Sequence, residues 1–403
     1  MKILFIRSLN PFYESSASGN RFASIIKGLL ENNITITLVI TGGYNDMNEY
    51  KYKKGLKQYN NLSIYYTNFI FNNNIWFRRF NRYIIKGITN LINLYKLKRF
   101  FKQKFDYIFL TNNSDCLAAF NKYHNIISCK SIIELNEFND FYKGHNLNLV
   151  QLRAAQNNEK LFLSAVKKID CFAVMTNTLL EHYKKMARQD ANFFHFPMTV
   201  DLSRFNINKN DIKYSKPYIA YTGALSNIKD GIDILIKAFN IIAPKYPDIH
   251  LYLAGFYNED VIMQKQLIEE YKLQERVTYL GTLDKEDIPN FICNASMLVL
   301  PRPDSHQAQG GFPTKLGEYL ASGNPVCVTS VGEIPDYLED NISAFMAKPG
   351  DIVSFADAMD RALSNTNTRI NVGINGRKVA EEIFNIDIQS KRLVEFLSEN
   401  LKN

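Results

Sequence analysis

The sequence has few cysteines, and they are not arranged to hold a metal ion or a disulfide framework. The five thiols are isolated, and no Cys-x-x-Cys pair occurs (Cys116, Cys129, Cys171, Cys293 and Cys327). This scatter excludes zinc ribbons and disulfide-rich scaffolds, and it is typical of proteins in a reducing compartment. We therefore expect a cytoplasmic protein.

Long hydrophobic runs are also missing. No uninterrupted apolar stretch approaches the roughly 20 residues that a membrane-spanning helix needs. Arg7 interrupts the first apolar run before it reaches the length of a signal-peptide core. The composition, 46% hydrophobic and 22% charged over 403 residues, is that of a folded chain of two or three domains. We expect a soluble or peripheral protein.

Three common ligand-binding motifs are absent. No Gly-x-Gly-x-x-Gly follows a strand-like run, and no Gly-rich P-loop ending in Gly-Lys-Ser/Thr occurs. These absences argue against dinucleotide-dependent dehydrogenases and P-loop ATPases. No Asp-x-Asp pair is present to hold a divalent cation against a nucleotide diphosphate. We therefore expect neither a metal ion nor a cofactor.

One segment lacks acidic residues. The formal net charge is +8, and residues 76–105 contain nine basic residues and no acidic one. The rest of the chain is close to neutral, so the protein is not generally basic. Apolar residues recur in this segment at three- and four-residue spacing, as on one face of a helix (Phe80, Ile84, Ile88, Leu91 and Tyr95).

Two interpretations of residues 76–105 stay open. A basic amphipathic helix with aromatic residues can lie on an anionic membrane surface. Alternatively, the apolar face packs on the domain's own core and the basic face is solvated. A nucleic-acid interface is disfavoured because no zinc-finger or RNP-like motif accompanies the charge.

Short apolar runs alternate with helical patterns along the whole chain. Such alternation predicts parallel α/β sheets, and two series of it predict two doubly wound halves. A ligand would then bind outside the carboxyl ends of the strands. The expected strands are 2–6, 34–41, 63–67, 107–111, 131–135, 171–175, 218–222, 250–254, 277–280, 297–300 and 325–329.

Two Gly-containing motifs follow strands of the second half. In the first, residues 221–231, Gly223 opens a turn that leads into a helix, and Lys229 lies nearby. A diphosphate at a helix N-terminus gains backbone N–H donors and the helix dipole, to which a lysine adds charge. A tight turn with a surface lysine is the alternative interpretation.

The second motif, residues 302–326, is the more specific. A Gly-rich loop permits close backbone approach to a ligand, and the helix after it carries Glu318. Glu318 could accept both hydroxyl groups of a ribose, and Lys315 and Arg302 could neutralise phosphate. A solvated or capping glutamate is the simpler interpretation of Glu318 alone.

Together, the segments TGALSNIKDG and GGFPTKLGEYLASGNPV closely resemble the C-terminal half of GT-B glycosyltransferases of family 4, the glycosyl transferases group 1. Weaker matches occur in the family's order, including FPMTVD with Phe205 after it. The resemblance implies two Rossmann-like domains facing a central cleft. The acceptor-binding domain would comprise 1–203, with 385–403 crossing back to it, and the nucleotide-sugar domain 204–384.

The resemblance also implies an activity. It is the retaining, metal-independent transfer of a sugar from a nucleotide-diphosphate sugar, with a UDP-sugar favoured. The acceptor would be a sugar, typically lipid-linked, in bacterial capsule, O-antigen or related polysaccharide synthesis. The protein would then act in the cytoplasm at the inner face of the membrane, contacting it through residues 76–105.

Roles are implied residue by residue. Lys229 would bind the diphosphate and Glu318 the ribose, with Lys315 beside them as catalytic groups. The remaining donor contacts would be Gly19, Gly223, Tyr279, Gly281, Arg302, His306, Gln309, Gly310, Gly311, Phe312, Pro313, Thr314 and Leu316. Acceptor-side candidates at the ends of the first half's strands and its first glycine loop are Asn20, Asn112, Glu134 and Glu137, although the two glutamates could be surface carboxylates.

Two positions depart from the family pattern. Gly310 replaces a glutamate that contacts the transferred sugar, and Ala224 replaces an arginine. Lys315 or Arg302 could supply the missing positive charge, and His306, Gln307 or Gln309 could contact the sugar instead. A catalytically silent nucleotide-sugar-binding protein, or another GT-B enzyme such as an epimerase or phosphorylase, is the alternative.

Overall fold

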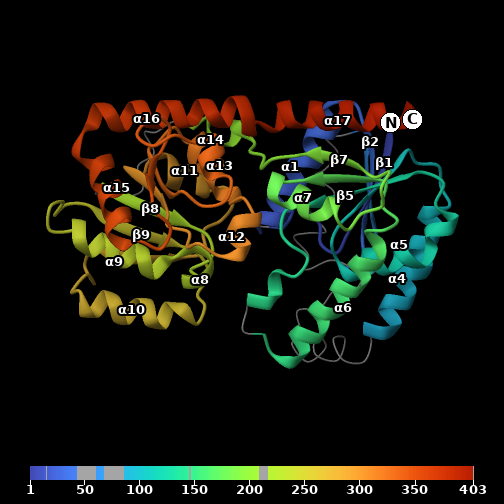
Figure 1. Cartoon of the computed structure of the whole chain (residues 1–403), viewed down its shortest axis with the longest axis horizontal. Helices are drawn as coiled ribbons and strands as arrows, with labels where there is room; N and C mark the ends of the chain where they lie inside the picture. Colours follow the sequence, from blue (N-terminus) through green and yellow to red (C-terminus); the bar gives the residue numbers. More distant parts are fainter. Residues whose placement is uncertain (15, 43–59, 68–85, 145–146, 208–216, 403) are drawn as a thin grey trace. The chain divides into compact units, whose positions relative to one another are not determined.

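The computed structural model describes residues 1–402 except 15, 43–59, 68–85, 145–146 and 208–216 (Figure 1). The described chain divides into two compact units, Met1–Pro197 with Ser390–Asn403, and Met198–Gln389. The first boundary lies before the expected 203/204 because Met198 and Val200 belong with the second unit. Val200 exchanges backbone hydrogen bonds with Phe384 and Ile386, at 2.8 and 3.1 Å.

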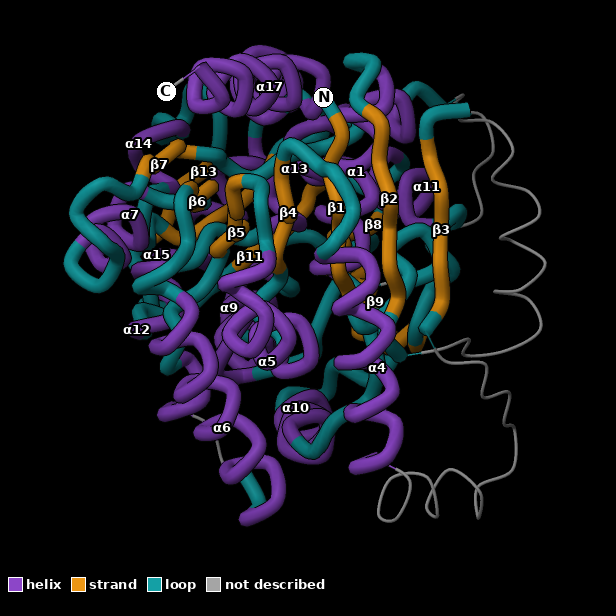
Figure 2. Tube along the Cα trace, turned by 90° about the vertical axis from the view of Figure 1, so that its right-hand side faces the viewer, coloured by secondary structure: helices purple, strands orange, loops and turns teal. Residues whose placement is uncertain are grey.

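The first unit is built on a seven-stranded parallel sheet with the order β3-β2-β1-β4-β5-β6-β7. Figure 2 shows β1, β2 and β3 side by side at one edge. The strands are β1 Lys2–Arg7, β2 Thr35–Ile40, β3 Leu62–Tyr66, β4 Tyr107–Leu110, β5 Lys130–Leu135, β6 Cys171–Val174 and β7 Asn192–His195. The helices are α1 Ala17–Glu31, α4 Lys86–Phe101, α5 Ser114–Tyr123, α6 Leu149–Ala165 and α7 Asn177–Lys184, with short 3-10 turns at His124–Ile126 and Phe141–Gly144.

Both faces of this sheet are buried. Along β1, Leu4 and Ile6 pack into one core with α4, α5, α6 and α7, whereas Ile3 and Phe5 pack into another core with α1. The second core also contains Leu393 and Leu397 of the C-terminal helix α17, Ile386–Lys402. A parallel sheet covered on both faces requires continuous apolar strands, which explains the runs seen in the sequence.

The second unit has a six-stranded parallel sheet with the order β10-β9-β8-β11-β12-β13. Its strands are β8 Tyr218–Thr222, β9 His250–Ala254, β10 Val277–Gly281, β11 Met297–Leu300, β12 Val326–Thr329 and β13 Phe345–Ala347. Its helices are α8 Asn227–Asp230, α9 Ile232–Ile242, α10 Asp260–Glu270, α11 Ile288–Cys293, α12 His306–Gly310, α13 Thr314–Ala321, α14 Ile334–Tyr337, α15 Ile352–Ser364 and α16 Thr366–Val379, with a 3-10 turn at Leu202–Phe205 and a π-helical turn at Ala380–Phe384.

The predicted fold class is confirmed, since both sheets are parallel and alternate with helices along the chain. All the expected strands are present. The sequence did not indicate β7 and β13, which are only four and three residues long. It also predicted a loop where α12 forms a short helix. Among the described residues, no helix is both long and apolar enough to cross a membrane.

Candidate functional site

The turn after β8 forms the centre of a polar site at the carboxyl edge of the second sheet. Gly223 has a φ of +137°, and a Cβ there would overlap the ammonium group of Lys315. A Cβ on Gly255, after β9, would overlap the carbonyl oxygen of Gly223. Both positions therefore require glycine, at 223 for its backbone conformation as well as for space.

Lys315 lies in the first turn of α13, and its side chain is 17% exposed. Its Nζ donates a hydrogen bond to the hydroxyl of Tyr221 at 2.7 Å and forms an ion pair with Oδ1 of Asp230 at 3.1 Å. Burial lowers the pKa of Lys315, Asp230 raises it, and the nearby charges of Arg302 and Lys229 lower it again. Three cations and one carboxylate thus share this turn.

Arg302 and Lys229 both lie near enough to Lys315 to lower its pKa, and they come from different parts of the second unit. Arg302 is buried just after β11, and its Nη1 donates to the carbonyl oxygen of Gly311 at 3.3 Å. Lys229 is exposed on α8, a single turn capped by Ser226 that ends at Gly231, with a φ of +70°. The helix that follows the turn, α9, starts at Ile232, directly after this short helical turn.

Glu318 lies one turn further along α13 and is paired with a residue that the sequence analysis missed. Nη1 of Arg204 donates to Oε1 of Glu318 at 2.6 Å. Nη2 of Arg204 also contacts the carbonyl oxygen of Lys285 at 3.4 Å. Burial and Arg204 lower the pKa of Lys285. The sequence did offer a signal for Arg204, because this residue directly precedes Phe205 in the segment that matched the family's linker.

The loop from 303 to 313 divides its predicted contacts between surface and core. His306 and Gln309 are exposed on α12, where Nε2 of Gln309 donates to Oδ1 of Asp304 at 2.6 Å. Phe312 packs against the rings of Tyr337 and Phe384, with centroids 5.5 and 5.4 Å away. Of the remaining predicted contacts, Gly310 ends α12, Gly311 and Pro313 cap the two neighbouring helices, and Thr314 and Leu316 flank Lys315 at the start of α13.

A buried glutamine connects the end of β10 with the turn after β8. The hydroxyl of Tyr279 donates to Oε1 of Gln264 at 3.1 Å. Nε2 of Gln264 donates to the carbonyl oxygen of Leu225 and to Oδ1 of Asn227, at 2.9 and 2.7 Å. Beyond Tyr279, Gly281 has a φ of +72° and open space beside it. The sequence offered no signal for Gln264, because an isolated glutamine on a helix is ordinarily solvated.

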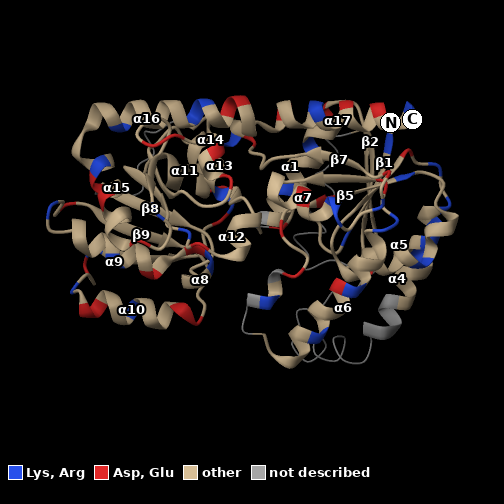
Figure 3. Ribbon diagram, in the orientation of Figure 1, with Lys and Arg blue, Asp and Glu red and all other residues tan. Residues whose placement is uncertain are grey.

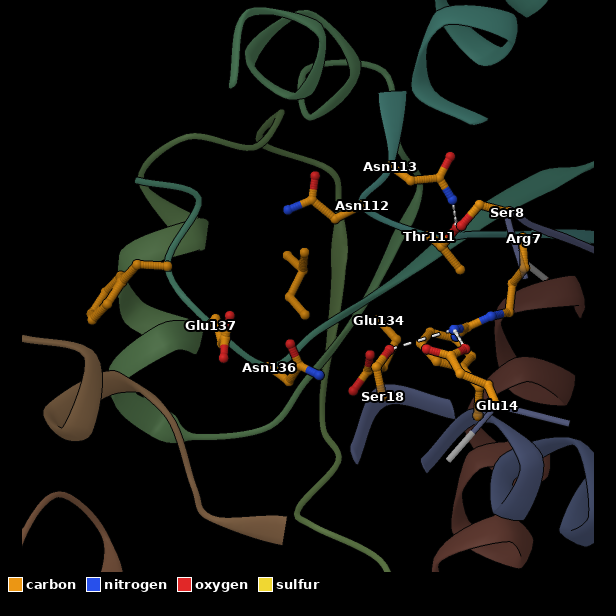
Figure 4. Close-up of a pocket in the computed structure, with 13 residues that line it drawn as sticks. Arg7, Ser8, Glu14, Ser18, Thr111, Asn112, Asn113, Glu134, Asn136 and Glu137 are labelled. Atoms are coloured by element: carbon orange, nitrogen blue, oxygen red, sulfur yellow. Dashed lines mark hydrogen bonds and ion pairs between the residues drawn. The ribbon is translucent and has the colours of Figure 1, made fainter. Parts of the chain in front are cut away.

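The first unit has a pocket of about 300 Å³ at the carboxyl ends of β1, β4 and β5 (Figure 4). Buried Arg7 reaches it from the end of β1, where its Nη2 donates to Oε2 of Glu14 at 3.0 Å. Burial lowers the pKa of Arg7, while Glu14 and Glu134 raise it. The pocket is lined by Arg7, Ser8, Glu14, Ser18, Phe22, Thr111, Asn112, Asn113, Glu134, Leu135, Asn136, Glu137 and Phe138.

Three predicted acceptor-side residues line this pocket, and one does not. Asn112 and Glu137 line it, as does Glu134, which is buried and so is no surface carboxylate. Nε of Arg21 donates to Oε1 of Glu134 at 2.5 Å. Asn20 of α1 is absent from the lining, and its Oδ1 is buried and accepts no hydrogen bond from the described residues.

Gly19 also does not line the pocket but allows its wall to form. Its amide donates to Oγ of Ser16 at 3.0 Å, which caps α1. A Cβ at Gly19 would lie 2.6 Å from Cβ of Glu14. Glycine at this position therefore leaves room for the carboxylate that pairs with Arg7.

Comparison with known proteins agrees with this geometry. Residues 203–379 match the family model described as glycosyl transferases group 1. The amylovoran biosynthesis glycosyltransferase AmsK of Erwinia amylovora is 25% identical over 201 residues. That match covers 50% of this chain and 49% of AmsK, so it spans about half the length of each protein.

Solved structures match along almost the whole chain. Sucrose-phosphate synthase from Thermosynechococcus elongatus superposes with a TM-score of 0.75 at 14% identity, covering 100% of this chain and 99% of that one. Anabaena HepE, solved in complex with UDP and glucose, gives a TM-score of 0.72 at 16% identity, covering 99% and 100%. The resemblance found in the two Gly-containing motifs is thereby confirmed. Residues 203–379 belong to the glycosyl transferases group 1 family, and the chain has the GT-B fold.

Proposed function

We propose that this chain is a glycosyltransferase that moves a sugar from a nucleotide-diphosphate sugar, preferentially a UDP-sugar, to a sugar acceptor. The observation that carries the proposal is the placement of the Lys315 ammonium at the glycine turn after β8, with the charges of Arg302 and Lys229 near it. A diphosphate leaving group gains negative charge as its bond to the sugar breaks, and fixed cations stabilise that charge. The UDP bound to HepE supports the choice of nucleotide.

Each part of the donor has a place in the second unit under this proposal. The diphosphate lies against the Lys315 ammonium and the first amides of α13, and Arg302 and Lys315 supply the charge absent at Ala224. The ribose hydroxyls donate to Glu318, which Arg204 holds in place through its hydrogen bond. The base lies beside Tyr279 and Gly281.

We further propose that the transfer retains the anomeric configuration and needs no divalent cation. Protein cations provide the charge compensation that a metal ion supplies in other transferases. Attack by the acceptor hydroxyl on the face that the diphosphate leaves needs no protein nucleophile. The leaving phosphate can accept the acceptor's proton as the new bond forms.

The acceptor sugar would occupy the pocket of the first unit. Its lining offers hydroxyl and amide groups from Ser8, Ser18, Thr111 and Asn112, together with carboxylates. These groups both donate and accept hydrogen bonds, as recognition of sugar hydroxyls requires. Arg7 and Glu14 compensate each other's charge, which suits a neutral sugar ring.

A lipid-linked acceptor in surface-polysaccharide synthesis would place the protein at a membrane, and α4 supports this. Its Leu97 and Phe101 are buried in the core, but Leu91 and Tyr95 are 64% and 67% exposed. The alternative in which this apolar face packs on the domain's own core is wrong for Leu91 and Tyr95. Lysines and arginines accompany them (Figure 3). Residues 76–85 of the basic segment lie outside the described residues.

The proposal is tested by nucleotide binding. Isothermal titration with UDP, GDP, ADP and CMP, in the presence of EDTA, should give binding by UDP above the others. Lys229→Ala should weaken it about fivefold, since one phosphate–lysine contact is lost. Lys378→Ala, an exposed lysine on α16, is the matched control and should have no effect. Binding of no diphosphate would overturn the proposal, and binding without sugar transfer would indicate a silent protein.

A further inference from the structure

Asp230 forms a buried ion pair at the glycine turn that the reaction scheme does not explain. Its side chain is 3% exposed, at the last position of α8, and its Oδ1 lies 3.1 Å from Nζ of Lys315. Its Oδ2 is buried and accepts no hydrogen bond from the described residues. A carboxylate beside a site for a diphosphate repels the ligand, so its presence demands a compensating role.

The position of the Lys315 ammonium indicates what the role of Asp230 is. Its ammonium occupies the space that a side chain at Gly223 would fill, and Tyr221 lies under it with the ring centroid 4.5 Å away. The hydroxyl of Tyr221 accepts from Lys315 and donates to the carbonyl oxygen of Ala224 at 2.6 Å. Tyr221 and Asp230 thus fix the ammonium from two elements, β8 and α8.

We propose that Asp230 is a positioning residue that holds the Lys315 ammonium against the Gly223 turn, where it meets the donor diphosphate. This inference rests on the proposed function. The Asp230 carboxylate repels the anionic ligand to some extent. It also holds the Lys315 ammonium in one orientation and favours its protonated form. A lysine ammonium is otherwise mobile about several rotatable bonds and strongly hydrated.

The charged groups around Lys315 determine how its pKa changes when Asp230 is neutralised. The charges of Arg302 and Lys229 lower the pKa of Lys315, as burial does, while Asp230 raises it. Without this carboxylate the pKa of Lys315 falls further. Lys315 then loses its proton at a lower pH, and affinity for the diphosphate declines at a lower pH than in the wild type.

Asp230→Asn tests the proposal, with Asp233→Asn as its matched control. Asp233 also pairs with a lysine, at 3.0 Å, but its partner is Lys237 of α9 and not Lys315. UDP affinity would be measured by titration from pH 7 to 9.5, above the second pKa of a phosphate group at about 6. At pH 7 Asp230→Asn should weaken binding about tenfold, the loss expected for one charge-assisted hydrogen bond.

The pH profile separates positioning from a purely structural role. In Asp230→Asn the decline in affinity should start at lower pH, whereas Asp233→Asn should follow the wild type. In a Lys315→Met background, Asp230→Asn should cause no further loss. Equal or stronger binding by Asp230→Asn with an unchanged profile, in a wild type that does bind UDP, would overturn the inference alone. Failure of the wild type to bind any diphosphate would instead defeat the proposed function.

A second variant covers the case in which Asp230→Asn does not fold. Tyr221→Phe keeps the ring beneath Lys315 but removes the hydroxyl that accepts from Nζ. It should weaken UDP binding several-fold with little change in melting temperature. Unchanged affinity in this variant would show that the ammonium needs no fixed position.

Discussion

The glycine turn after β8 shows how single residues determine the geometry of this site. Gly223 is needed because its φ of +137° and the ammonium of Lys315 leave no room for a side chain. The same contact places the positive charge of Lys315 next to backbone that a ligand can approach. One hydrogen atom in place of a methyl group therefore decides whether the cation can occupy the turn.

We expect Gly223→Ala to lower both stability and UDP affinity. The backbone strain should cost about 1–3 kcal/mol, and displacement of Lys315 should weaken UDP binding at least about tenfold. Gly350→Ala is the control, since Gly350 has a φ of +76° but open space around it. It should cost about 1 kcal/mol and leave UDP affinity unchanged. Thermal denaturation and titration measure the two effects, and equal UDP affinity in both variants would contradict the prediction.

Site residues that lie within a sequence motif could be predicted from the sequence, but the residues that form ion pairs with them could not. Lys315, Arg302 and Glu318 stand in a recognisable pattern, and the structure brings Lys315 and Arg302 together. Arg204 and Asp230 reach their partners across 114 and 85 positions of the chain. Such pairing depends on tertiary packing, which one sequence does not reveal. Asp230 lies within the motif 221–231, but a role in ligand binding was predicted for the adjacent Lys229 and not for Asp230.

At the scale of elements, α4 shows the limit of periodicity. The apolar residues of this helix are spread over more than one face, so spacing alone did not show which would pack inward. Asn93 fixes the choice, because its side chain is buried between the ends of β2 and β3, donating to the carbonyl oxygen of Thr41 at 3.1 Å and accepting from Thr67 at 2.5 Å. Leu97 and Phe101 come next on the same side.

The exposed apolar residues of α4 should contribute to membrane binding. The double variant Leu91→Ser/Tyr95→Ser should bind vesicles containing anionic lipid at least about tenfold more weakly, since two apolar side chains no longer enter the interface. Ile370→Ser/Ile374→Ser, an equally spaced and half-exposed pair on α16, is the control. Vesicle co-sedimentation measures the affinity. Identical binding by both variants would argue that α4 does not contact lipid.

At the scale of the whole molecule, α17 is the helix that returns the chain from the second unit to the first. It starts in the second unit and ends in the first, where Leu393 and Leu397 are part of the core beneath β1 and β4. The hydroxyl of Tyr107 donates to the carbonyl oxygen of Leu397 at 2.9 Å. The helix itself was predictable from its pattern, whereas its destination was implied by the family resemblance.

Leu397→Ala should destabilise the first unit by about 2–5 kcal/mol, because it leaves a cavity in a fully buried site. Leu401→Ala, one turn further along and 41% exposed, should change stability by no more than about 0.5 kcal/mol. Native-state hydrogen exchange is the suitable measurement, since a chain of two units has no single unfolding free energy. Equal loss of protection in both units of Leu397→Ala would contradict the assignment of α17 to the first.

The route of α17 also orders events during synthesis. Residues 198–389, which form the whole second unit, emerge from the ribosome before residues 390–402. The first unit is therefore translated first but lacks part of its core until the last helix arrives, some 290 positions after β4. The nucleotide-binding half can fold from one contiguous stretch, while the other half waits with an apolar surface exposed. In the cell, that waiting surface is where a chaperone would be most needed.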